Sequence, residues 1–231
     1  KPIFGVEAYF IPSIEEWREE YEIVMADKKR ARGAKKDAAS GATVEDEVDS
    51  KKVQDLLRRR RHLILLAQNQ TGLNNLFKLV SESYQSENFY RYPRMDYALL
   101  AKYSEGVIGA SACLGGVYAG NYWENRDYGQ EAVLNAMRET TRQMLDIFGD
   151  RWYGELQWNN IVEQHELNQH IIEVCKEFDV TLISTADSHY PNREARKDRE
   201  LYKRLKFLKG GFKPDYVTDE IPETIEELGM E

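Results

Sequence analysis

The segment VTLISTADSHY, residues 180–190, decides the fold because it joins an expected strand to two chemically active side chains. Residues 180–185 are mostly apolar or β-branched, which is typical of a buried strand. Asp187 and His189 follow, and in an extended segment residues at this spacing share a face. A carboxylate and an imidazole on one face suit a divalent metal ion. The alternative is a hydrogen-bonded Asp–His pair in a loop.

Four further runs have the same apolar and β-branched character as this segment. They are PIFGVEAYF (2–10), HLILLAQ (62–68), GVIGASAC (106–113) and RWYGELQW (151–158). The runs are nearly continuous rather than alternating, as in strands that are buried on both faces. Helical patterns cover residues 71–85, 95–103, 129–150, 160–179 and 193–210. Strands that alternate with helices predict an α/β fold of parallel strands joined by right-handed crossovers, as a barrel or an open sheet.

Composition limits the class of protein. The chain has 231 residues, of which 42% are hydrophobic, so it can bury the core of one large domain or two small ones. A net charge of −8 argues against coating nucleic acid by bulk charge, although RRRR at 58–61 forms a local basic patch. Two cysteines do not make a disulfide framework, which indicates a reducing, cytoplasmic location. No run of roughly 18 apolar residues exists, so no membrane span is expected.

One stretch interrupts the alternation of strands and helices. Residues 26–57 are rich in Ala, Lys, Asp and Gly and predict a flexible charged insertion between the first two strands. Its basic half is either a solvated loop or a contact to nucleic acid. The remaining pattern predicts a main domain over residues 1–212 and an exit segment, 213–231, that leads toward a following domain.

The active sites of parallel α/β folds gather at the C-terminal ends of the strands. Glu7 lies inside an apolar strand, where an unpaired carboxylate would be costly to bury. His62 begins the second strand, and Cys113 ends the third, before two glycines. Each has a simpler interpretation: an outward-facing glutamate, a satisfied core histidine and a small core thiol. With Asp187 and His189, however, these three residues form a candidate metal constellation contributed by four different strands.

The order of the motifs resembles the PHP (polymerase and histidinol phosphatase) domain family. The segments that carry the resemblance are KPIFGVEAYF, RHLILLAQNQTGLNNLFKLVSESY, YSEGVIGASACLGG, RWYGELQ and LISTADSHY. These motifs resemble most the PHP domains of bacterial and phage replicative DNA polymerases (DNA polymerase III alpha subunits, C family). The resemblance covers nearly all of the chain except residues 26–57. The resemblance implies a distorted (β/α)7, TIM-like barrel. The family's first H-x-H strand and D-H turn have no counterpart here, so we expect an N-terminally incomplete barrel with about five of its strands.

The resemblance also implies a metal centre. The family holds up to three divalent ions, zinc, manganese or iron, and up to four of its ligands lie in the H-x-H and D-H segments. Its other ligand positions fall on Glu7 in GVE, His62 in RHLILL, Cys113 in SACLGG, and Asp187 and His189 in ADSHY.

The activity that the resemblance implies is metal-dependent hydrolysis of phosphodiesters, as in a proofreading 3′–5′ exonuclease. The implied partners are DNA and the remaining polymerase domains, together with a proofreading subunit or a sliding clamp bound through the parent DNA-directed DNA polymerase. Two alternatives remain open. One is a catalytically inactive PHP module that stabilises the polymerase or docks a proofreading subunit, and the other is a stand-alone PHP phosphatase.

Overall fold

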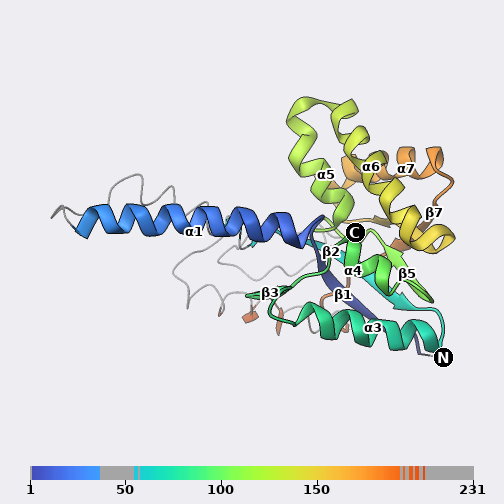
Figure 1. The fold of residues 1–231 in the computed structure, drawn as a ribbon. Helices are drawn as coiled ribbons and strands as arrows, with labels where there is room; N and C mark the ends of the chain where they lie inside the picture. The colour runs from blue at the N-terminus through green and yellow to red at the C-terminus, as the bar shows by residue number, and fades with distance from the viewer. Residues whose placement is uncertain are drawn as a thin grey trace.

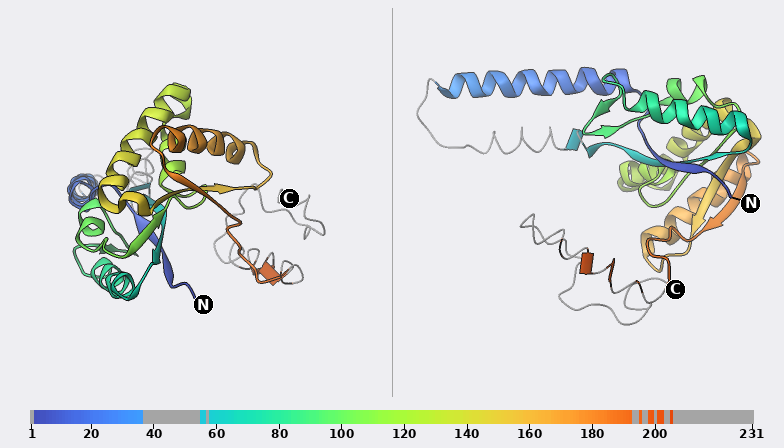
Figure 2. Two further views of the ribbon diagram at one scale, coloured as in Figure 1. Left: turned by 90° about the vertical axis from the view of Figure 1, so that its right-hand side faces the viewer. Right: turned by 90° about the horizontal axis from the view of Figure 1, so that it is seen from below.

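The computed structural model describes residues 2–36, 55–56, 58–192, 195, 198–199, 201–202 and 205. A five-stranded sheet with the strand order β1-β2-β5-β6-β7 forms its centre (Figure 1). The strands are β1 (Gly5–Phe10), β2 (Arg61–Ala67), β5 (Val107–Ala110), β6 (Trp152–Gln157) and β7 (Thr181–Thr185). They coincide with the five predicted runs, so the α/β class and the strand assignment are confirmed. The described strands form an open, twisted sheet (Figure 2), and the distorted barrel remains a prediction.

Helices pack against one face of this sheet. They are α3 (Gln70–Ser83), α4 (Tyr97–Lys102), α5 (Val117–Asn125), α6 (Gln130–Phe148) and α7 (Val162–Glu177). Short connections are made by η1 (Arg126–Tyr128), η2 (Gly149–Arg151) and the paired strands β3 (Phe89–Tyr90) and β4 (Tyr92–Pro93). Four of the five helices match predicted ones, and α5 was not predicted. The predicted helix 193–210 lies mostly outside the described residues. None of the described helices is long and apolar enough to cross a membrane.

The main hydrophobic core lies on the helix-covered face. Ala8, Leu63 and Leu65 point into it and are less than 5% exposed. Glu7 and Ile64 lie on the same strands but point to the opposite face, where their side chains are exposed or half-buried. Strands β1 and β2 therefore alternate in burial, and the predicted burial on both faces is wrong for these two strands.

Strand β2 runs in the direction opposite to its neighbours. Strands β5, β6 and β7 pair in parallel as predicted, but β2 is antiparallel to both β1 and β5. The prediction of an all-parallel sheet is therefore wrong at β2. The connections explain this difference: α1 (Ile14–Lys36) leaves the sheet instead of crossing it (Figure 1), and the chain runs out along α3 and returns through α4. As a result, β5 begins beside the end of β2, where Val107 pairs with Ala67.

Helix α1 includes part of the segment that the sequence assigned to a flexible insertion. Residues 26–36 are helical because alanine, lysine and arginine favour this conformation. Residues 37–54 and 57 lie outside the described residues, so the rest of the expected insertion stays untested. At the base of α1, Trp17 stacks on Tyr21 with ring centroids 5.5 Å apart. The buried guanidinium of Arg94 lies 4.3 Å from the Trp17 ring and joins this helix to the β3–β4 hairpin.

The start of α3 lies against the start of β5 at two glycines. Asn69 caps the helix, since its Oδ1 accepts a hydrogen bond from the Gly72 N–H at 3.0 Å. A Cβ atom on Gly72 would lie only 1.8 Å from the carbonyl oxygen of Gly106. This close approach of two backbones fixes where β5 begins relative to the end of β2.

We expect Gly72→Ala to lower the free energy of unfolding by about 2–3 kcal/mol, because the new methyl group must push the two backbones apart. Alanine's higher helix propensity offsets only about 1 kcal/mol of this cost. Denaturant unfolding followed by circular dichroism measures the change. Thr71→Ala, an exposed neighbouring substitution, serves as the control and should change stability by less than about 0.5 kcal/mol. Equal stability of the two variants would contradict the tight contact.

Candidate metal centre

Three of the five predicted metal ligands meet at one edge of the sheet. Glu7 and His62 project from β1 and β2 on the face opposite the helices, and Cys113 lies in the loop after β5. His62 Nδ1 lies 2.7 Å from Glu7 Oε1 and 3.4 Å from Cys113 Sγ. A carboxylate oxygen and a thiol sulfur therefore converge on a single imidazole nitrogen.

Glu7 is not a buried carboxylate. Its side chain is 49% exposed, so the desolvation argument that singled it out from the sequence does not apply. The alternative of an outward-facing glutamate is closer to the structure, except that the carboxylate is paired with His62. The contact with His62, rather than burial, makes Glu7 a candidate ligand.

The antiparallel direction of β2 places His62 at this edge. His62 is the second residue of β2 and pairs with Tyr9, close to the C-terminal end of β1. Its N–H donates to the carbonyl oxygen of Gly115 at 2.8 Å, which holds the Cys113 loop beside it. In a fully parallel sheet, the first residues of β2 would lie at the opposite edge. The meeting of His62 with Cys113 thus depends on a strand direction that the sequence pattern did not predict.

The loop that carries Cys113 has a strained backbone. Ala112 has a φ of 62°, a conformation that residues with a side chain seldom adopt and that often marks functional sites. A Cβ atom on Gly116 would lie 2.1 Å from the carbonyl oxygen of Ser111, so the turn closes too tightly for any other residue. The Gly115 N–H donates to Cys113 Sγ at 3.4 Å. Together these features aim the thiol at His62.

The pKa of the Cys113 thiol indicates that Asp187 is also nearby. Burial raises this pKa, and the negative charges of Asp187 and Glu7 raise it further, against the lowering effect of the Gly115 N–H. Asp187 therefore lies close enough to Cys113 to act on its charge. The raised pKa keeps the thiol protonated at neutral pH, so a metal ion that binds the sulfur has to displace a proton.

Asp187 and His189 follow β7 in an irregular loop. Strand β7 ends at Thr185, and the φ of 47° at Asp187 excludes the extended conformation predicted for this segment. A turn brings the two residues together instead, with His189 Nδ1 2.7 Å from the Asp187 carbonyl oxygen and 3.9 Å from Oδ1. Because a carbonyl oxygen only accepts, Nδ1 carries the hydrogen, and Nε2 of the neutral ring presents a lone pair.

The donor atoms fit a borderline divalent ion such as zinc, because thiolate, imidazole and carboxylate are its usual ligands. Within the described ranges, however, no three His, Cys, Asp or Glu side chains surround a common point as the ligands of a bound ion would. Glu7 Oε1 and Cys113 Sγ each contact His62 Nδ1 instead. The assignment of five metal ligands therefore stays a prediction.

Glu155 was missed in the sequence, although it lies beside this cluster. It occupies β6 and is 6% exposed. Its Oε2 accepts a hydrogen bond from the N–H of Ala112 at 2.9 Å, and its Oε1 accepts one from Thr185 Oγ1 at 2.6 Å. The signal that could have found it was the one used for Glu7, a carboxylate inside an apolar strand.

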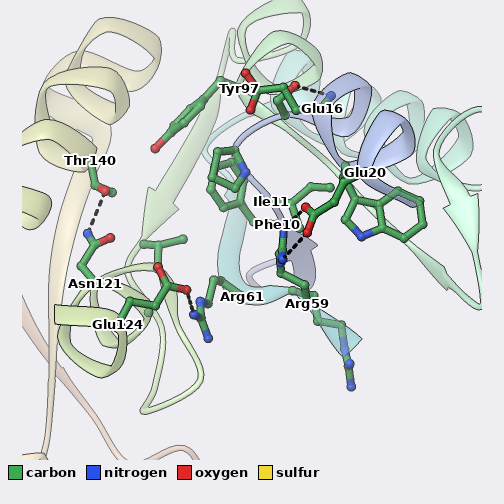
Figure 3. A pocket seen from close by; sticks show the side chains of 16 residues that line it. Phe10, Ile11, Glu16, Glu20, Arg59, Arg61, Tyr97, Asn121, Glu124 and Thr140 are labelled. Carbon is green, nitrogen blue, oxygen red and sulfur yellow. Dashed lines mark hydrogen bonds and ion pairs between the residues drawn. The ribbon is translucent and has the colours of Figure 1, made fainter. Parts of the chain in front are cut away.

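A cavity of about 560 Å³ lies on the helix-covered side of the same edge (Figure 3). Three arginines of the RRRR patch line it, Arg59, Arg60 and Arg61. Two of them are paired, Arg59 with Glu20 and Arg61 with Glu124. Asn121 Nδ2 donates to Thr140 Oγ1 at 2.7 Å on the opposite wall. Because Arg59 and Arg61 have carboxylate partners, this cavity is less positive than four consecutive arginines suggest.

We expect the two cysteines to differ in reactivity. Cys175 is 1% exposed and burial raises its pKa to about 12, whereas Cys113 is only half-buried. Since the thiolate is the reactive form, the metal-free native chain should take up one equivalent of iodoacetamide at about pH 8.5, more slowly than an ordinary thiol. Intact mass spectrometry measures the uptake. Cys113→Ser should take up none and Cys175→Ser should still take up one. Modification of both thiols in the native chain would contradict the burial of Cys175.

The fold and the cluster define an α/β protein with a candidate metal centre at one edge of its sheet. Residues 1–159 match the family described as "PHP domain", and the chain belongs to this family. The resemblance seen in the sequence motifs is thereby confirmed.

Relatives of the chain are large polymerase subunits. DNA polymerase III subunit alpha of Aquifex aeolicus is 39% identical over 196 residues, which are 85% of this chain and 14% of that protein. The protein of the same name from Borreliella burgdorferi is 40% identical over 62% of this chain and 12% of its own length. The protein from Thermus aquaticus is 35% identical over 61% of this chain and 11% of its own length. The chain therefore spans 14% or less of these relatives.

Proposed function

We propose that this chain is the PHP domain of a replicative DNA polymerase alpha subunit, that it binds divalent metal ions, and that it hydrolyses phosphodiester bonds at DNA 3′ ends. The convergence of Glu7 Oε1, His62 Nδ1 and Cys113 Sγ, with Asp187 nearby, carries the metal-binding part. Similarity to proteins named DNA polymerase III subunit alpha supports the role in replication. We further propose that the sheet belongs to a distorted (β/α)7 barrel, as the family resemblance implies.

In this proposal the cluster residues take distinct roles. Cys113 as thiolate and His62 and His189 as neutral imidazoles would hold zinc, manganese or iron, and Glu7 and Asp187 would supply carboxylates that help to hold or orient the ions. When bound, divalent cations lower the pKa of a water molecule and offset the negative charge that builds on a phosphodiester during hydrolysis. The chain itself orients the donors. The His62 N–H bond to Gly115 holds the imidazole beside the thiol, and the hydrogen bond of His189 Nδ1 leaves Nε2 available.

DNA is held mainly by the other polymerase domains in this proposal. The net charge of the chain is −8, and Arg59 and Arg61 at the nearby cavity are already paired with glutamates. A chain with this charge distribution attracts a phosphate backbone only weakly. The cytoplasmic partners would accordingly be the remaining polymerase domains, with a proofreading subunit or a sliding clamp bound through the parent protein.

A second candidate function is that of a catalytically inactive module that stabilises the polymerase. The contact between His62 and Glu7 favours it, because His62 Nδ1 donates to the carboxylate and is satisfied without a cation. Metal binding would have to replace this hydrogen bond. Whether a metal ion competes successfully for these atoms distinguishes the two candidates.

Metal content is the first measurement. We expect the purified chain, reconstituted with Zn²⁺, Mn²⁺ or Fe²⁺, to retain at least one equivalent by inductively coupled plasma mass spectrometry. The variant Cys113→Ser, Asp187→Ala should lose most of it, because two donors are removed. Asp150→Ala, an exposed aspartate on η2, is the matched control and should bind metal as the unmodified chain does. A chain that retains no metal would refute the proposal in favour of the inactive module.

Hydrolysis is the second measurement. We expect the metal-loaded chain to shorten a 5′-labelled single-stranded oligonucleotide from its 3′ end, and a chelator to stop the reaction. Asp187→Ala should lower the rate by at least about 100-fold, because a carboxylate that orients the ions is removed. Metal binding without any shortening would assign the site a structural role. Activity that persists in Asp187→Ala would indicate a contaminating nuclease.

A further inference from the structure

The side chain of Glu155 connects the two loops that carry candidate ligands. Strand β6 lies between β5 and β7 in the sheet, so a side chain at its C-terminal half can reach both neighbours. Glu155 Oε2 accepts from Ala112 N–H, next to Cys113, and Oε1 accepts from Thr185 Oγ1, two residues before Asp187. One carboxylate therefore sets the separation between the thiol loop and the Asp187 loop.

Further hydrogen bonds fix this carboxylate in place. The backbone N–H of Glu155 donates to Ser111 Oγ at 2.8 Å, which gives the thiol loop a second attachment to β6. Gln157 Nε2 donates to Thr185 Oγ1 at 3.3 Å and orients the hydroxyl toward Glu155. A strained residue such as Ala112 keeps its positive φ only when its surroundings determine it. The bond from Ala112 to Glu155 supplies such a constraint.

The burial of Glu155 makes its contacts with the two loops energetically important. A buried carboxylate is costly unless hydrogen bonds or a cation compensate it. Both hydrogen bonds to its oxygens come from neutral groups. In the part of the chain that the structure describes, no lysine, arginine or histidine forms an ion pair with it. The compensation in the described residues therefore comes from the hydrogen bonds to the two loops, which makes these attachments costly to lose.

We propose that Glu155 is a positioning residue of the metal centre. Its carboxylate holds the Cys113 loop and the Asp187 loop at the separation that shared metal binding requires. Glu155 itself is not a ligand in this proposal, because both of its oxygens are engaged by Ala112 and Thr185. The inference rests on the metal binding proposed above.

Cobalt binding by the full chain tests the role of Glu155. Titration with Co²⁺ alone gives an affinity, and thiolate-to-cobalt charge-transfer absorption reports whether the Cys113 sulfur is a ligand. We expect Glu155→Ala to weaken Co²⁺ binding by about 10- to 100-fold, the usual loss when a group that supports metal ligands is removed. The charge-transfer band per bound ion should also decrease. A change of band separates misplacement of the thiol from a general loss of stability.

Glu155→Gln separates position from charge. Its amide oxygen can still accept from the Ala112 N–H, and its NH₂ group can donate to Thr185 Oγ1, so both attachments persist without the negative charge. We expect Co²⁺ affinity and the band to stay within about threefold of the unmodified chain. If Glu155→Gln is as defective as Glu155→Ala, then charge rather than position is decisive and the proposal is overturned.

Two further variants control for loss of folding. Thr141→Val removes a fully buried hydroxyl that contacts Tyr118 and Met137, away from the candidate site. It should lower stability and leave the Co²⁺ affinity unchanged. Thr185→Val removes only one of the two bonds to Glu155, and we expect a smaller loss of affinity in the same direction, which makes it informative if Glu155→Ala fails to fold. Its effect should be non-additive with that of Glu155→Ala, because both act through one contact.

The outcomes distinguish this inference from the proposed function. If the unmodified chain shows no Co²⁺ binding, both are refuted. If it binds Co²⁺ with a thiolate band and Glu155→Ala does so equally well, metal binding stands and the positioning role is refuted. If Thr141→Val loses as much affinity as Glu155→Ala, the effect is one of general stability, and the positioning role is again refuted.

Discussion

The antiparallel pairing of β2 with both β1 and β5 decides which side chains can meet at the candidate site. It sets Tyr9 opposite His62 and Ile64 opposite Ala110. Because side chains alternate along a strand, this register puts His62 on the same face as Glu7. A shift of one residue would turn the imidazole toward the helix-covered core. The glycine contact at the start of β5 and the bond from His62 N–H to Gly115 O both hold this register.

The same alternation divides the RRRR patch between the two faces of the sheet. Arg61 points to the helix side and pairs with Glu124. Arg60 lies on the side of His62, with its guanidinium 4.7 Å from the Tyr9 ring and 4.1 Å from the Tyr92 ring. Cation–π contacts and ion pairs thus occupy arginines that, in the sequence alone, formed one basic patch. The arginines of this patch therefore chiefly stabilise the packing around the start of β2.

Much of the fold could be predicted from the sequence because apolar runs report burial. The five strands and helices α3, α4, α6 and α7 followed from periodicity and length. The direction of β2 could not be predicted, because the apolar pattern of a strand is the same in either direction. The direction is set by the path of the connections before and after the strand. Helix α5 was missed because its sequence, VYAGNYWEN, contains glycine and aromatic residues with weak helix propensity and is stabilised by burial of Tyr118 and Tyr122.

The candidate site was predictable in its residue types but not in its geometry. Asp187 and His189 were expected to meet by strand alternation, and they meet through a turn that the left-handed backbone of Asp187 makes.

Glu7 and Glu155 carry the same sequence signal, a carboxylate inside an apolar strand, yet their surroundings differ. Glu7 lies at the half-exposed surface against an imidazole, whereas Glu155 is buried and held by a backbone N–H and a hydroxyl. A pattern of residue types cannot separate these cases, because the difference depends on which strand is central in the sheet. Strand β1 is one of the two edge strands of the described sheet, and its carboxylate stays accessible for ligation. Strand β6 lies between two strands, so its carboxylate can bind both adjoining loops.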